Sequence, residues 1–193
     1  MDEHEFDDIL ETWPTLAGVS RFAGLIRGCP WFRHVGDPMT AELARDARHY
    51  AGALGFPEAA PAVLAAWDDA AAAGESLDVN APAWEAEEHL RMTLAARAEE
   101  IIDAAALELV LTHISAVAAD AVSEGAEAAR SFLLIDDDAF LRAATGAGVQ
   151  ACYSAALVLA AGEGPDHPLS LKFQIFEHGR WPVSLIGGSL NIF

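Results

Sequence analysis

The chain has 193 residues, 53% of them hydrophobic, and its 30 Asp and Glu outnumber 11 Lys and Arg to give a formal net charge of −19 at pH 7. A chain this apolar can bury a core, which excludes extensive disorder, and its length suits one domain over residues 1–193. Nucleic-acid binding needs clustered cations, and anionic membranes repel an acidic surface. The charge therefore argues against both partners.

Cysteine usage and the N-terminus predict a cytoplasmic protein. Cys29 and Cys152 lie far apart and fit no CxxC or zinc-type spacing, so two buried thiols are expected. The first residues are acidic and lack the apolar core of a signal peptide. No uninterrupted apolar run reaches the ~18 residues of a membrane span. Abundant alanine and a preference for arginine over lysine are typical of a high-GC bacterial genome.

Helical spacing of apolar residues dominates the chain up to about residue 162. Helices are predicted over residues 5–13, 15–28, 38–54 and 58–73. Asp37 and Pro38 resemble a helix start, since a capping carboxylate precedes proline at the first helical position. Together with the helices that follow, about six to eight helices are expected in a helical part spanning residues 1–162.

The longest predicted helical segment opens at Pro82 and meets no Gly or Pro until Gly125. A helix of that length is several times the mean, so we expect one break near residues 103–106, where bulky side chains become sparse. After a short apolar stretch, the triplet Asp136-Asp137-Asp138 is predicted to cap a helix over residues 139–161 by interacting with its dipole.

Beyond residue 165 the apolar period changes to two, which is typical of strands. Leu171, Phe173 and Ile175 alternate with polar residues, and the alternation returns on both sides of Gly187-Gly188, a pair suited to a tight hairpin turn. The predicted cross-strand pairs are Ile186 with Ser189, Leu185 with Leu190, and Val183 with Ile192. The predicted fold class is therefore α+β: a mostly helical domain with a C-terminal three-stranded antiparallel β-meander (residues 169–193) packed on the helices.

An acidic stripe follows the helix that opens at Pro82. At about 100° per residue one face carries Glu85, Glu88, His89, Glu99 and Asp103. Hard divalent cations need several oxygen ligands, but the two ends of this stripe are about 18 Å or more apart at 1.5 Å per residue. Glu85, Glu88, Glu99 and Asp103 are thus weak metal candidates that need acids from another helix, and a solvated amphipathic face is the favoured interpretation. No metal site and no cofactor are predicted.

Two aromatic and basic segments are the candidate binding residues: Trp31 and Arg33 in one, and His178, Arg180 and Trp181 in the other. Trp and Arg are the side chains most enriched at binding hot spots. The alternative is structural, with Trp181 covering the edge of the core and Arg180 pairing with a neighbouring acid.

The composition favours a non-enzymatic protein-binding module, of the immunity or inhibitor type, because a strongly acidic surface steers association with a basic protein partner. One alternative is a metal-dependent hydrolase whose carboxylates come from several helices, including Asp136. Another is a small-molecule binding module with an apolar pocket between helices and sheet, its mouth lined by Trp31 and Trp181. A homo-oligomer could form through an edge strand ending at Phe193 or through alanine-rich helix faces.

Overall fold

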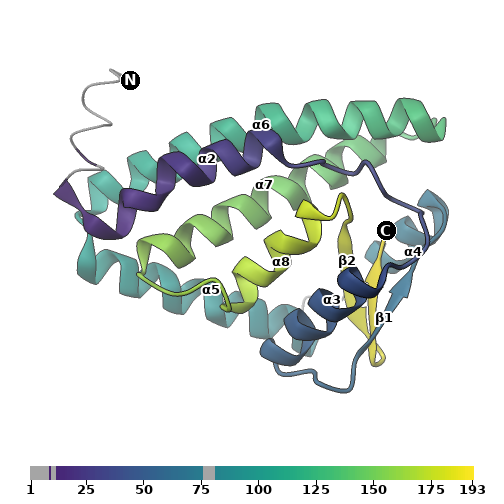
Figure 1. The fold of residues 1–193 in the computed structure, drawn as a ribbon, viewed down its shortest axis with the longest axis horizontal. Helices are drawn as coiled ribbons and strands as arrows, with labels where there is room; N and C mark the ends of the chain where they lie inside the picture. Colours follow the sequence, from purple (N-terminus) through teal and green to yellow (C-terminus); the bar gives the residue numbers. More distant parts are fainter. Residues whose placement is uncertain (1–8, 10–11, 76–80) are drawn as a thin grey trace.

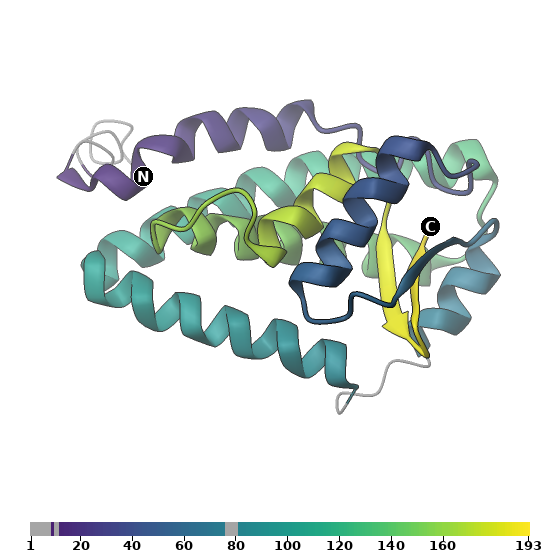
Figure 2. The same ribbon diagram turned by 60° about the horizontal axis from the view of Figure 1, so that its bottom comes forward.

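The computed structural model describes residues 9, 12–75 and 81–193, and within them it is mostly helical with one small sheet. The elements are a 3-10 helix η1 (Pro14–Gly18), α2 (Val19–Gly28), α3 (Ala41–Ala53), β1 (Ala60–Val63), α4 (Trp67–Glu75), α5 (Pro82–Ile101), α6 (Ala104–Leu133), α7 (Asp138–Ala160), α8 (Pro168–Glu177), β2 (Pro182–Ile186) and β3 (Ser189–Ile192). Helices α2, α5, α6 and α7 run along the long axis, and the sheet lies with α3 and α4 at one end (Figures 1 and 2). The α+β class and its helical predominance are confirmed.

The predicted break in the long helical segment is confirmed. Helix α5 ends at Ile101, and Ile102 adopts an extended conformation. The Asp103 carboxylate then accepts a 3.0 Å hydrogen bond from Ala105 N, which caps α6. The acidic triplet acts similarly at α7, where the Asp137 carboxylate accepts a 2.8 Å hydrogen bond from Ala139 N.

Helices α6 and α7 pack closely because small residues face each other around the Trp31 indole. A Cβ added at Gly125 of α6 would lie 2.4 Å from Trp31 Cβ. A Cβ added at Gly148 of α7 would lie 2.6 Å from Val122 Cγ1 and 3.3 Å from Trp31 Cζ3. The indole N–H donates a 2.9 Å hydrogen bond to Ile26 O, so the ring is fixed where both helices lack a side chain.

The sheet has the strand order β1-β3-β2 and is mixed. The predicted hairpin is confirmed: Leu185 pairs with Leu190 and Ile186 with Ser189, and Gly187 and Gly188 both have positive φ, as a type I′ turn requires. The predicted pairing of Val183 with Ile192 is wrong. Pro182 pairs with Ile192 instead, since a bulge at Val183 shifts the register.

The predicted first strand of the meander is wrong, because residues 168–177 form α8. Two cores explain the misleading alternation. Leu169, Phe173 and Phe176 of α8 pack into the main core between the long helices. Leu171 and Ile175 pack into a second core shared with α3 and the sheet. A helix held between two cores is apolar on opposite sides, and its sequence then resembles a strand with alternating burial.

The third strand is instead β1, which runs parallel to β3 and lies within the predicted helix over residues 58–73. Pro61 would interrupt a helix interior, whereas an edge strand tolerates it. Helix α4 follows at Trp67. β3 is thus the central strand rather than an edge, and Phe193 after it is buried.

Two further expectations concern the N-terminal third of the chain. The predicted helix over residues 38–54 begins later, at Ala41, because Thr40 supplies the cap by accepting a 3.1 Å hydrogen bond from Leu43 N. The predicted helix over residues 5–13 lies largely outside the described residues.

Helices α6 and α7 are each long and apolar enough to cross a membrane by length and composition. A core helix of a soluble protein meets the same criteria. Both helices contribute buried residues to the main core and pack against each other.

The two glycines of α7 should respond oppositely to alanine. Nothing lies within 4 Å of a Cβ at Gly146, so G146A should stabilise the protein by about 0.5–1 kcal/mol through helix propensity. G148A should destabilise it by about 1–3 kcal/mol, because the new methyl group overlaps Val122. Urea unfolding of both variants measures this. Equal midpoint shifts in the same direction would contradict the close approach of α6 and α7.

Candidate functional site

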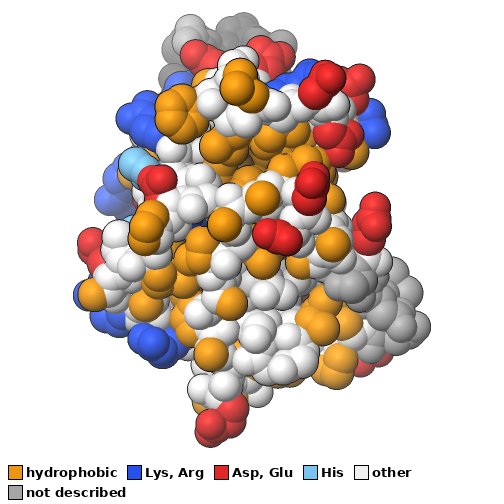
Figure 3. All heavy atoms as spheres, turned by 90° about the vertical axis from the view of Figure 1, so that its right-hand side faces the viewer, with side chains coloured by type: hydrophobic (Ala, Val, Ile, Leu, Met, Phe, Trp, Pro, Cys, Tyr) orange, Lys and Arg blue, Asp and Glu red, His pale blue; other side chains and the backbone are white. Residues whose placement is uncertain are grey.

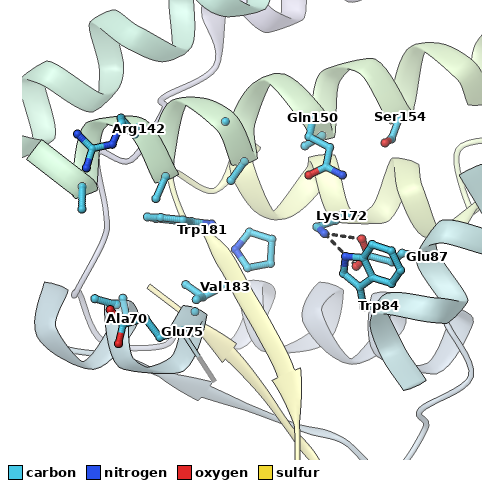
Figure 4. A pocket seen from close by; sticks show the side chains of 18 of the residues that line it. Ala70, Glu75, Trp84, Glu87, Arg142, Gln150, Ser154, Lys172, Trp181 and Val183 are labelled. Carbon is cyan, nitrogen blue, oxygen red and sulfur yellow. Dashed lines mark hydrogen bonds and ion pairs between the residues drawn. The ribbon is translucent and has the colours of Figure 1, made fainter. Parts of the chain in front are cut away.

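A cavity of about 600 Å³ lies between α4, α5, α7, α8 and β2. Three tryptophans from different parts of the chain contribute to its walls: Trp67 opens α4, Trp84 lies in α5, and Trp181 precedes β2. We call this cavity the tryptophan pocket. Figure 4 shows it from close by.

Helix α7 forms one long wall of the tryptophan pocket because of the spacing of its small residues. The lining positions recur every three or four residues, which places them on one helix face: Ala139, Arg142, Ala143, Gly146, Ala147, Gln150, Ala151 and Ser154. Alanine and glycine along this face leave the space that a larger side chain would fill. The two long polar side chains, Arg142 and Gln150, are both exposed.

The aromatic wall is held in place by hydrogen bonds. The rings of Trp67 and Trp181 stack with centroids 6.0 Å apart and planes 21° apart. Trp67 Nε1 donates a 2.7 Å hydrogen bond to Asp137 Oδ2. Trp181 exchanges two backbone hydrogen bonds with Phe193, of 2.7 and 2.8 Å. The carboxylate that caps α7 therefore also orients a pocket side chain.

At another end of the pocket, Lys172, the chain's one lysine, pairs with Glu87. Its ammonium donates to both carboxylate oxygens, at 2.9 and 2.6 Å, and Figure 4 shows this pair beside Trp84. The buried Tyr50 hydroxyl also donates to Glu87 Oε1. Burial, and then the Glu87 charge, raise the pKa of Tyr50 well above its ordinary value. The phenol thus stays protonated and keeps donating.

Two arginines also line the pocket, as does Glu75, and the two arginines differ in their partners. Arg91 Nε donates a 3.0 Å hydrogen bond to Glu88 Oε2, and hydrogen bonding by Arg91 lowers the pKa of Glu88. Arg142 makes no hydrogen bond or ion pair with any residue that the structure describes, and its charge only helps to lower the pKa of Asp137 at longer range. Among the three bases of the described pocket lining, Arg142 is therefore the one without a partner.

The structure brings the two predicted binding segments, around Trp31 and around Arg180, side by side. Their polar groups contact each other and neighbouring parts of the chain. His34 N donates a 3.1 Å hydrogen bond to Gly179 O. Arg180 is buried, and its Nη2 donates to the carbonyls of Asp37 and Pro38. Nη1 has no hydrogen-bond partner among the described residues. His178 Nε2 lies 2.9 Å from Asp46 Oδ2, so these polar groups face their own chain.

The three remaining members of that prediction, Trp31, Arg33 and Trp181, line cavities. Trp181 lies in the tryptophan pocket, whereas Trp31 and Arg33 line a second, open groove of about 840 Å³ against α6. Trp31 is only 4% exposed. Phe132, which also lines this groove, is 82% exposed. Hydrophobic side chains are visible among charged ones on the end of the molecule where α6 ends (Figure 3).

The weak metal candidates remain separated. Glu85 and Glu99 are exposed on α5, Asp103 caps α6, and Glu88 pairs with Arg91. Among the described residues, no group of three or more His, Cys, Asp or Glu is placed to hold a metal ion. The hydrolase hypothesis gains no support from this part of the chain.

Sequence reasoning missed Trp67, Trp84, Arg142 and Gln150 as site residues. One signal was present in α7, where Arg142 and Gln150 recur with small residues at helical spacing on one face. That spacing identifies a helix face but not the walls opposite it, and those come from α4, α5 and β2.

The hydrogen bond from the Trp67 indole to Asp137 should be detectable as a change in the pKa of Asp137. Hydrogen bonds from Trp67 and then Ala139 N lower the pKa of Asp137, so this carboxylate stabilises the fold above its unfolded pKa, and the contribution is lost as pH falls through the folded pKa. W67F should raise the pKa of Asp137, followed by NMR titration of its carboxyl carbon. Its destabilising effect should shrink on acidification. W84F is the matched control, and an equal shift in both variants would contradict the assignment.

Searches of protein-family models, of curated proteins and of solved structures find no match to this chain. The tryptophan pocket is therefore the feature from which a function can be inferred.

Proposed function

We propose that this protein is a non-enzymatic module that binds a small, largely apolar molecule in the tryptophan pocket. The observation that carries the proposal is a cavity of about 600 Å³ with three tryptophans and a row of small residues around a few polar groups. Ligand pockets typically measure about 300–1,000 Å³ and combine apolar walls with a small number of placed polar groups.

Part of the pocket wall is ordered by contacts within the chain. Trp67 is held by Asp137, and Lys172 and Tyr50 both donate to Glu87. Ordering a loose side chain on binding costs about 0.5–1.5 kcal/mol, so walls that are already ordered favour affinity.

The titratable groups favour binding over catalysis. The Lys172 ammonium is occupied by Glu87. Burial raises the pKa of Cys29 to about 12 and raises that of Cys152 as well, so neither thiol supplies a nucleophilic thiolate at neutral pH.

A pocket-filling variant tests the proposal with the neutral fluorescent dye N-phenyl-1-naphthylamine as the probe. G146F adds a ring where a Cβ meets no atom within 4 Å, so it should weaken dye binding at least tenfold while the protein stays folded. Two controls place phenylalanine elsewhere: G24F on the exposed side of α2, and A121F in the open groove. Binding that is lost only in A121F, or unchanged in G146F, would contradict the tryptophan pocket as the site.

A basic protein partner is a second candidate, favoured by the exposed acids along α5, among them Glu85, Glu99 and Glu100. Surface charges of one sign speed association with an oppositely charged partner, and this effect is screened over about 8 Å at physiological ionic strength. Proteins captured by the tagged chain at 50 mM NaCl should therefore be basic and should dissociate at 500 mM. The triple variant E85Q/E99Q/E100Q should capture less of them. Capture that is indifferent to salt would contradict electrostatic steering.

A further inference from the structure

We infer that the tryptophan pocket selects an elongated apolar ligand with a carboxylate at one end, bound by Arg142. The inference rests on the proposed function, since it names the ligand class of the same pocket. Three features support it: the distribution of charge, the pairing of the basic side chains, and the spacing of polar groups along α7.

The pocket is electrostatically unlike the rest of the chain. Its lining holds three bases, Lys172, Arg91 and Arg142, and three acids, Glu75, Glu87 and Glu88, so their formal charges cancel. The whole chain carries −19 with only 11 Lys and Arg. Three of these 11 bases therefore line one cavity in a chain whose charge would otherwise repel an anionic ligand.

Two of the three bases that line the pocket form ion pairs with glutamates of the same lining, and the third does not. Lys172 pairs with Glu87, and Arg91 pairs with Glu88. Arg142 is exposed and makes no hydrogen bond or ion pair with a described residue; its charge acts on Asp137 only at longer range. A guanidinium presents a planar fork of donors that matches the two oxygens of a carboxylate, and this fork is open to a ligand.

The spacing along α7 indicates the ligand's shape. Arg142 and Gln150 are eight residues apart on one helix face, which is about 12 Å at 1.5 Å per residue. Ala143, Gly146 and Ala147 line the interval, and Figure 4 shows Trp181 and Val183 across from this interval, with Arg142 and Gln150 on either side. An apolar body about 12 Å long would contact this strip and place its acid at Arg142.

Glu75 is the competing group. It ends α4 and lines the pocket across from the α7 wall that carries Arg142 (Figure 4). If Glu75 dominated, the pocket would favour an ammonium over a carboxylate, and a charge-matched series of probes separates these two outcomes.

The probes are biphenyl-4-carboxylate, 4-phenylbenzyl alcohol and 4-phenylbenzylamine, which share one elongated biphenyl body and differ in charge. Their affinities are measured by isothermal titration calorimetry on the full chain at pH 7.5 and 150 mM NaCl. The carboxylate should bind about tenfold more tightly than the alcohol, and the amine most weakly. R142Q should remove the preference for the carboxylate while the affinity for the alcohol stays unchanged. R21Q is the matched control, because it removes one exposed arginine of α2 outside the pocket and changes the net charge equally.

The outcomes separate the inference from the proposed function. Equal affinity for carboxylate and alcohol, tighter binding of the amine, or equal effects of R142Q and R21Q would overturn the role of Arg142. Binding of N-phenyl-1-naphthylamine without binding of any biphenyl probe would overturn the ligand class and leave the pocket's function standing. Failure of the dye and of all three biphenyl probes would overturn both.

Discussion

The contact between Trp31 and the glycines of α6 and α7 is the constraint on which the rest of the structure depends. Gly125 leaves room for the Cβ and carbonyl group of Trp31, and Gly148 leaves room for Val122 and the edge of the indole. The hydrogen bond from the indole to Ile26 O ties α2 to the same place. Phe173 and Phe176 of α8 pack against that indole with ring centroids 6.0 and 5.3 Å away. One side chain thus sets the spacing of four helices.

Helix α7 uses small residues for two different purposes on its two faces. On the face toward α6, Ala144 and Gly148 permit close packing, and the residues there are fully buried. On the other face, Ala143, Gly146 and Ala147 line the tryptophan pocket. The difference comes from what lies opposite. A complementary helix fills the first face, whereas the second faces Trp67 and Trp181, which hydrogen bonds and stacking hold in place, so the space persists.

The acidic residues of the chain also differ according to where they lie. Exposed acids such as Glu85 and Glu99 give the surface its sign, whereas Glu87 and Glu88 in the pocket are each matched by a base. Matching matters there because a partly buried carboxylate without a partner would lose hydration and gain nothing in return. The net charge of the chain therefore describes its exposed surface, whereas the pocket lining combines two matched ion pairs with the unpaired charges of Arg142 and Glu75.

The sequence by itself determined the features that depend on neighbouring residues. Asp103 and Asp137 cap helices through amides two residues away, and Gly187-Gly188 closes a hairpin between adjacent strands. The mostly helical α+β class followed from the same local patterns. Only the tertiary structure decided that residues 168–177 are a helix between two cores, that β1 completes the sheet, and that Trp67, Trp84 and Trp181 share a cavity. Periodicity reports which side chains are buried, but the partners that bury them lie tens of residues away, and their positions depend on the packing of the whole chain.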